Sequence, residues 1–122
     1  MWLFTTSGFY SAVQADDNPD TLIVRTRFRK DAEYLQRWIQ EELDEPSEFI
    51  VNPKADYLYR VKLSRRAWAQ FVYSEAEAID YGNYKAAALD AMRADAPRDR
   101  AYHSVWAAMA RAQEEARGQE ET

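Results

Sequence analysis

The stretch Ile79-Asp80-Tyr81-Gly82-Asn83-Tyr84-Lys85 divides this chain of 122 residues into two parts that differ in pattern. Before the stretch, segments with the two-residue period of strands alternate with segments that have the period of helices. After it, only helical patterns follow. The stretch therefore marks a change in architecture, and its carboxylate, amide, lysine and tyrosines also make it a candidate polar site.

Four strands are predicted before this stretch, in two hairpins that are each followed by a helix. In the clearest strand, Leu22 and Val24 alternate with Arg25 and Arg27. Residues 15–20 are dense in turn formers and are expected to form an exposed loop. Ser7-Gly8 is expected to be a kink, bulge or turn within the first strand. The expected strands cover 2–4 with 9–14, 21–29, 48–51 and 57–63.

Four helices are predicted as well. The first runs from Asp31 to Leu43, with Asp31 placed to cap it or to interact with its dipole. Ser64 is expected to cap a second helix that ends near Ile79. Two more helices are expected, at 84–92 and from 95–97 to about 112. The fold class is therefore α+β: an antiparallel four-stranded sheet in ββαββα order, backed by helices, with two further C-terminal helices.

Composition predicts one domain over 1–117, followed by a frayed polar tail at 118–122. Apolar residues make up 47% of the chain, which is enough for one core, and the four tryptophans are interpreted as core anchors. They are Trp2, Trp38, Trp68 and Trp106. The chain has no cysteine and no apolar run of membrane-spanning length, so we expect a cytoplasmic protein without a thiolate site. A net charge of −5 argues against non-specific coating of DNA.

A basic face is the strongest functional signal. The outward face of the two best strands is nearly all basic and carries no acid. Its cations are Arg25, Arg27, Arg29, Arg60 and Lys62. Arginine presents a planar fork that matches phosphate, and Tyr10 or Phe9, whichever points outward, would supply a stacking ring. The alternative is a solvated face, or one neutralised by the acidic stretches at 41–48 and 114–121.

A second candidate is the polar cluster of Asp80, Asn83, Lys85 and His103, the only histidine. A carboxylate could orient this histidine as a general acid or base, and Asp99 could pair with it locally. The structural interpretation is that Asp80 or Asn83 caps the third helix. With one histidine and no cysteine, the sequence indicates no metal site and no cofactor.

Several motifs together resemble a family of small, uncharacterised bacterial proteins. They are Gly8-Phe9-Tyr10-Ser11-Ala12-Val13, Ile79-Asp80-Tyr81-Gly82-Asn83-Tyr84-Lys85 and Ala101-Tyr102-His103-Ser104-Val105-Trp106. The resemblance covers most of the chain. It implies a free-standing cytoplasmic domain, and it implies no activity, substrate or site residue.

The sequence thus predicts a small non-catalytic binding module whose basic face contacts an anionic partner, with single-stranded nucleic acid as one candidate. Two alternatives stay open. One is a protein–protein interaction or inhibitory module, for which a homodimer is compatible, and the other is a small enzyme centred on Asp80 and His103. No membrane partner is expected.

Overall fold

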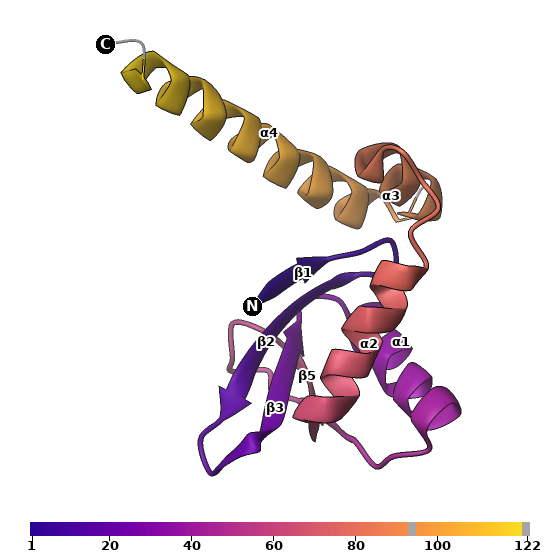
Figure 1. The fold of residues 1–122 in the computed structure, drawn as a ribbon. Coiled ribbons are helices and arrows are strands. Elements are labelled where there is room, and N and C mark those ends of the chain that lie inside the picture. Colours follow the sequence, from indigo (N-terminus) through magenta and orange to yellow (C-terminus); the bar gives the residue numbers. More distant parts are fainter. Residues whose placement is uncertain (93–94, 121–122) are drawn as a thin grey trace. The chain divides into compact units, whose positions relative to one another are not determined.

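A computed structural model describes residues 1–92 and 95–120 of the chain (Figure 1). The chain forms two compact units, Met1–Asp80 and a second that begins at Tyr81. The sequence predicted one domain over 1–117. The division between the units falls within the stretch 79–85, at the place where the sequence pattern changes.

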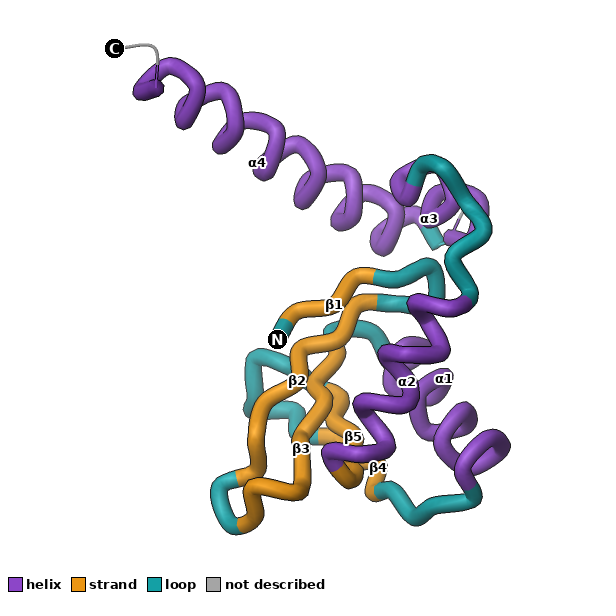
Figure 2. The backbone as a smooth tube through the Cα atoms, in the orientation of Figure 1, coloured by secondary structure: helices purple, strands orange, loops and turns teal. Residues whose placement is uncertain are grey.

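The first unit is built on a five-stranded antiparallel sheet with the strand order β1-β2-β3-β5-β4 (Figure 2). Its strands are β1 (Trp2–Phe4), β2 (Phe9–Ala15), β3 (Asn18–Thr26), β4 (Glu48–Val51) and β5 (Tyr59–Ser64). The predicted α+β class with an antiparallel sheet is confirmed, and the predicted number of four strands is wrong. The expected loop at 15–20 is also shorter, because β3 already begins at Asn18.

The fifth strand arises from a tight turn between Phe4 and Phe9. The Thr5 N–H donates to the Gly8 carbonyl at 2.9 Å, and the Thr5 hydroxyl accepts the N–H groups of Ser7 and Gly8. Hydroxyl-to-backbone bonds of this kind favour a turn over extended chain. The chain therefore reverses, and β1 pairs with β2 rather than extending it.

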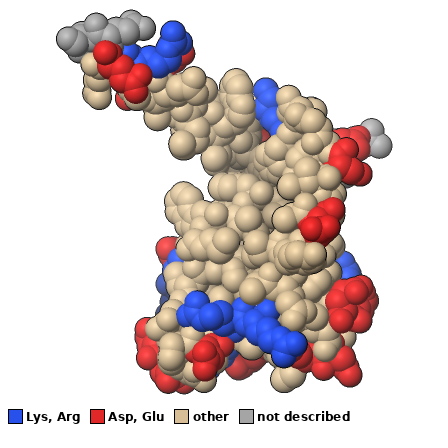
Figure 3. Space-filling view, viewed as in Figure 1, with Lys and Arg blue, Asp and Glu red and all other residues tan. Residues whose placement is uncertain are grey.

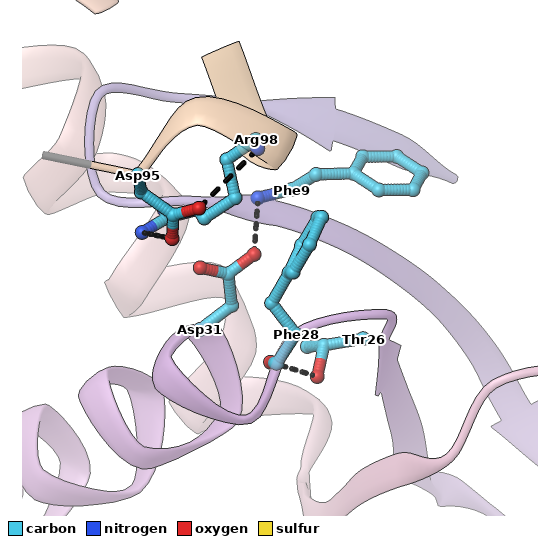
Figure 4. A network of polar contacts seen from close by, with 6 residues as sticks. All are labelled: Phe9, Thr26, Phe28, Asp31, Asp95 and Arg98. Carbon is cyan, nitrogen blue, oxygen red and sulfur yellow. Dashed lines mark hydrogen bonds and ion pairs between the residues drawn. The ribbon is translucent and has the colours of Figure 1, made fainter. Parts of the chain in front are cut away.

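Asp31 fixes this turn to α1 (Arg29–Trp38). Its carboxylate is buried and accepts the Phe9 N–H at 3.1 Å, so it joins the sheet to the first helix (Figure 4). A Cβ on Gly8 would lie 2.5 Å from Asp31 Cγ, which explains why this position has no side chain. Near the same place, the Thr26 hydroxyl donates to the Phe28 carbonyl at 2.9 Å where β3 ends.

Both helices of the first unit lie on the same side of the sheet (Figure 1). They are α1, which continues as the short π-helix η1 (Ile39–Leu43), and α2 (Arg65–Glu77). The Ser64 hydroxyl accepts the Ala67 N–H at 3.0 Å, which confirms the predicted cap of α2. The core between the helices and the sheet consists of Tyr10, Ala12, Leu22, Val24, Ala32, Leu35, Ile39, Val61, Leu63, Ala67, Trp68 and Phe71.

The second unit contains α3 (Tyr84–Met92) and α4 (Ala96–Glu120), which contact each other. Asn83 caps α3, since its side-chain oxygen accepts the Ala86 N–H at 3.0 Å, as one sequence interpretation predicted. At the start of α4, Asp95 accepts the Arg98 N–H and pairs with its guanidinium at 3.7 Å (Figure 4). This helix continues past Ala112 to Glu120. Of the tail predicted at 118–122, residues 118–120 are helical and 121–122 lie outside the described residues.

The tryptophans differ from the prediction that all four anchor the core. Trp68 is buried, and Trp38 packs against the core with its ring 5.4 Å from that of Phe71. Trp2 and Trp106, however, are 68% and 55% exposed. For these two residues the prediction is wrong, because the fold leaves both on surfaces.

Candidate functional site

The candidate site is the face of the sheet opposite α1 and α2, which we call the outer face. Directly paired residues of an antiparallel sheet share a face, so the strand register defines its composition. One row of paired residues crosses all five strands in the order Trp2, Ser11, Arg25, Arg60 and Ile50. We call this set the cross-strand row. It places an aromatic ring, a hydroxyl group and two guanidinium groups side by side.

A second row supplies another cation. Val13 pairs with Ile23, Ile23 with Lys62, and Lys62 with Glu48 on the edge strand β4. Lys62 therefore stands next to Arg60 on the outer face, while Val61 between them points into the core. Glu48 is an acid at the margin of this face. In the described chain it forms no ion pair with Lys62.

Arg29 was predicted to share this face, and the structure places it elsewhere. β3 ends at Thr26, so strand alternation no longer applies three residues later. Arg29 is the first residue of α1, and its guanidinium lies over the rings of Phe49 and Tyr59. Both rings pack against the core on the helix-covered side. Arg29 also pairs with Glu33 at 3.6 Å, so it is removed from the candidate site.

Tyr57 belongs to the site, although the sequence predicted it as the first residue of a strand over 57–63. The strand begins only at Tyr59, and the Asn52 N–H bonds to the Leu58 carbonyl to close the loop before it. The buried Tyr57 ring lies under two guanidinium groups, 4.6 Å from that of Arg25 and 3.9 Å from that of Arg27. Such cation–π contacts hold the two arginines in place.

Arg27 is fixed by a second contact in the same loop. Its Nη1 donates to the Asp56 carbonyl at 2.8 Å, and the side chain is otherwise exposed. The residue types at 52–56 indicate a turn directly before Tyr57. If this turn is taken to continue through residue 58, Tyr57 lies outside the strand and strand alternation does not fix its face.

Tyr10 was predicted as a stacking ring, and the structure excludes it from the outer face. Its side chain is fully buried in the core, with its ring 5.8 Å from that of Trp68 and 5.3 Å from that of Phe71. The alternative residue of that prediction, Phe9, does point to the outer face. It is almost covered, however, by Trp2 and Phe4.

The cations of the outer face are not neutralised by acids. Within residues 1–92 and 95–120, no carboxylate forms an ion pair with the four cations that the structure brings together, which are Arg25, Arg27, Arg60 and Lys62. Arg25 Nη2 donates to the Ser11 hydroxyl at 2.7 Å. The Nε atoms of Arg25 and Arg60 are buried and have no hydrogen-bond partner in the described part of the chain. The face therefore carries uncompensated positive charge.

Another group of basic side chains lies on the opposite side of the first unit. Figure 3 shows a band of Lys and Arg atoms beside the start of α2. Arg65, at this start, is engaged within the protein: its Nε and Nη2 donate to the Pro19 carbonyl, and Nη2 also donates to Gln14 Oε1 at 2.9 Å. Its donors hold the β2–β3 hairpin against α2, which gives this arginine a structural role.

The residues of the predicted polar cluster are divided between the two units. Asp80 is exposed at the end of the first unit, whereas Asn83, Lys85 and His103 belong to the second. Asn83 acts as a helix cap, and Lys85 Nζ lies 4.1 Å from the Trp106 ring centroid.

His103 is exposed, and among the described residues it forms no ion pair with Asp99. It lines a cavity of about 30 Å³ in the second unit, which has room for only one or two water molecules. In the described ranges, 1–92 and 95–120, no group of three His, Cys, Asp or Glu side chains could hold a metal ion.

The carboxylate of Glu75, on α2, has a perturbed pKa. Burial raises the pKa of Glu75, although a hydrogen bond from the Ser7 hydroxyl at 3.1 Å opposes this shift. Burial, with the nearby Glu75 charge, also raises the pKa of Tyr34. The Ser7 hydroxyl is bonded to the Tyr10 hydroxyl at 3.1 Å, so the network joins the β1–β2 turn to α2. We interpret it as structural, because Tyr10 is fully buried and the half-buried Ser7 and Glu75 join two elements of the same unit.

Comparisons of the chain with protein-family models, with curated proteins and with solved structures found no match in any of the three. The resemblance to a family of small bacterial proteins therefore stays a prediction. Among the described residues, no helix has the length and apolar character needed to cross a membrane.

Proposed function

We propose that this protein is a non-catalytic binding module that contacts the phosphates of a nucleic acid through Arg25, Arg27, Arg60 and Lys62. The observation that carries the proposal is the pair formed by Arg25 and Arg60. These two guanidinium groups are directly opposite each other on neighbouring strands, and no described carboxylate compensates them. An acidic chain of net charge −5 thus concentrates cations on one face.

The electrostatic repulsion between Arg25 and Arg60 supports a role for this pair in binding. Like charges placed directly opposite in a sheet destabilise it by about 0.2–1 kcal/mol. A phosphate that accepts hydrogen bonds from the Nη groups of both arginines removes this repulsion. The ring of Tyr57 orients the Arg25 guanidinium for such a contact, and the Asp56 carbonyl orients that of Arg27.

The test is fluorescence anisotropy with a labelled 12-nucleotide single strand and with its duplex. If four phosphates are neutralised, the affinity for the single strand falls about 50-fold between 50 and 200 mM salt, since the slope is about −0.7 per contact. Arg60→Gln lowers the affinity and reduces this salt factor to about 20-fold.

Arg66→Gln is the matched control, because Arg66 is exposed on α2 and the substitution changes the net charge equally. Its affinity and salt slope should remain close to those of the unmodified protein. Absence of binding to either oligonucleotide rejects the proposal. It is also rejected if Arg66→Gln weakens binding as much as Arg60→Gln, because net charge rather than the outer face would then decide affinity.

A further inference from the structure

We infer that the nucleic acid is bound as a single strand, with a base stacked on Trp2 while its backbone follows Arg25 and Arg60. This inference rests on the proposed function and names the form of nucleic acid that the same face takes. Trp2 is 68% exposed, whereas tryptophan is usually among the well-covered residues of a fold. An exposed aromatic ring on a cationic face is the arrangement by which several sheet proteins hold unpaired bases.

The ring of Trp2 is supported from behind. Its centroid lies 5.8 Å from that of Phe9 at an interplanar angle of 89°. Phe9 in turn stacks on Phe4, with centroids 4.3 Å apart and planes 16° apart. These contacts orient the indole before any ligand arrives, which lowers the entropic cost of stacking on it.

The register of the sheet relates this ring to the cations. Trp2, Ser11, Arg25 and Arg60 are successive members of the cross-strand row. With strands about 4.8 Å apart, Arg25 lies about 10 Å from Trp2 across the sheet, and Arg60 about 14 Å. A single-stranded nucleic acid that crosses the sheet along this row therefore meets the stacking surface of Trp2 first and two phosphate-binding guanidinium groups next.

A duplex makes poor use of this arrangement. Its bases are paired and stacked on each other, so Trp2 would meet only the sugar-phosphate backbone or groove edges. An unpaired base presents a free π face of any sequence, and stacking on an aromatic side chain is therefore tolerant of sequence. Trp2 is predicted to add affinity for single strands and to add little for duplexes.

An exposed tryptophan also occurs in protein interfaces, where it is enriched among the residues that dominate affinity. Charge favours nucleic acid here, because the four cations around the row complement a phosphate backbone and Glu48 at the margin is the one acid that the strand pairing places on this face.

The test compares Trp2→Ala with the unmodified protein on three ligands: the 12-nucleotide strand, its duplex, and an abasic strand of equal length and charge. We expect Trp2→Ala to weaken binding to the single strand about 5- to 150-fold, the range for loss of one stacked base. Its salt slope should not change, and its affinities for duplex and abasic strand should stay near those of the unmodified protein. Trp2→Phe should lose less, which guards against an effect on folding.

Tyr73→Ala is the matched control, because this tyrosine is 67% exposed on α2, away from the outer face. It should bind all three ligands normally. If the protein binds the single strand in a salt-dependent way and Trp2→Ala binds it equally well, the inference is overturned and the proposed function stands. An equal loss on the single strand and the abasic strand also overturns it. Binding to vesicles of anionic lipid but to no oligonucleotide overturns both.

Discussion

Arg60 and Arg25 are expected to respond in opposite ways to the same substitution, although they are paired partners on one face. The Arg60 side chain has no hydrogen bond or ion pair with a described residue, and it faces a like charge. Arg60→Gln removes that repulsion and is predicted to raise the free energy of unfolding of the first unit by up to about 1 kcal/mol. A gain of about 0.5 kcal/mol corresponds to about 2–4 °C in Tm for a domain of this size.

Arg25→Gln should instead destabilise the first unit. It loses the hydrogen bond from Nη2 to Ser11, which as a bond from a charged donor contributes about 1.5–3 kcal/mol. It also loses the contact with Tyr57, about 0.5–1 kcal/mol. Against these losses stands the same relief of repulsion, so the net loss is about 1–4 kcal/mol. In the double variant the repulsion is removed only once, so its loss exceeds the sum of the single effects by about 0.2–1 kcal/mol.

The measurement is urea unfolding of the four proteins followed by far-UV circular dichroism, together with hydrogen exchange of the amides in β3 and β5. The exchange experiment reports the opening of this sheet independently of the second unit. A loss of more than about 1 kcal/mol in Arg60→Gln would refute the reasoning, because it would mean that Arg60 stabilises the fold. Additive single effects would show that the two charges do not interact.

Two further predictions concern the helix-covered side. Gly8→Ala places a Cβ within 2.5 Å of Asp31 Cγ and should cost about 1–3 kcal/mol in urea unfolding, whereas Gly118→Ala has open space and should cost nothing. If Gly8→Ala were as stable as the unmodified protein, this result would contradict the close approach of Gly8 to Asp31. Because burial raises the pKa of Glu75 above its ordinary value of 4.5, the stability that this group contributes is full below that value and is lost as pH rises through the raised pKa. Urea unfolding at pH 4 and pH 7 should therefore show a loss in the unmodified protein that is smaller in Glu75→Gln; equal losses would contradict it.

Strand alternation predicted the centre of the site correctly and its margins incorrectly. Arg25 and Arg60 lie within β3 and β5, where a period of two fixes the face of each side chain. Arg29 and Tyr57 lie beyond the strand ends, where the period no longer holds. A count that is continued past the end of a strand assigns a face that the backbone no longer provides.

The remaining differences depend on tertiary packing that no local pattern specifies. Tyr10 and Phe9 are adjacent and both aromatic, and only the pairing of β2 with its neighbours decides which of them meets Trp68 in the core. Trp2 is apolar in sequence, yet it lies on the face that the helices do not cover. The chain reversal at Thr5 is predictable from the sequence. A threonine whose hydroxyl can accept the N–H groups two and three residues later, here those of Ser7 and Gly8, is a local turn signal.

The most direct test of the central claim is an NMR titration of the ¹⁵N-labelled protein with the 12-nucleotide single strand. We predict that the largest amide and side-chain shifts occur at the cross-strand row, including the Trp2 indole N–H and the Arg25 and Arg60 side-chain N–H groups. Resonances of α1 and α2, including Arg66, should move little. Shifts confined to those helices or to the second unit, or no shifts at all, would contradict the assignment of the outer face as the binding surface.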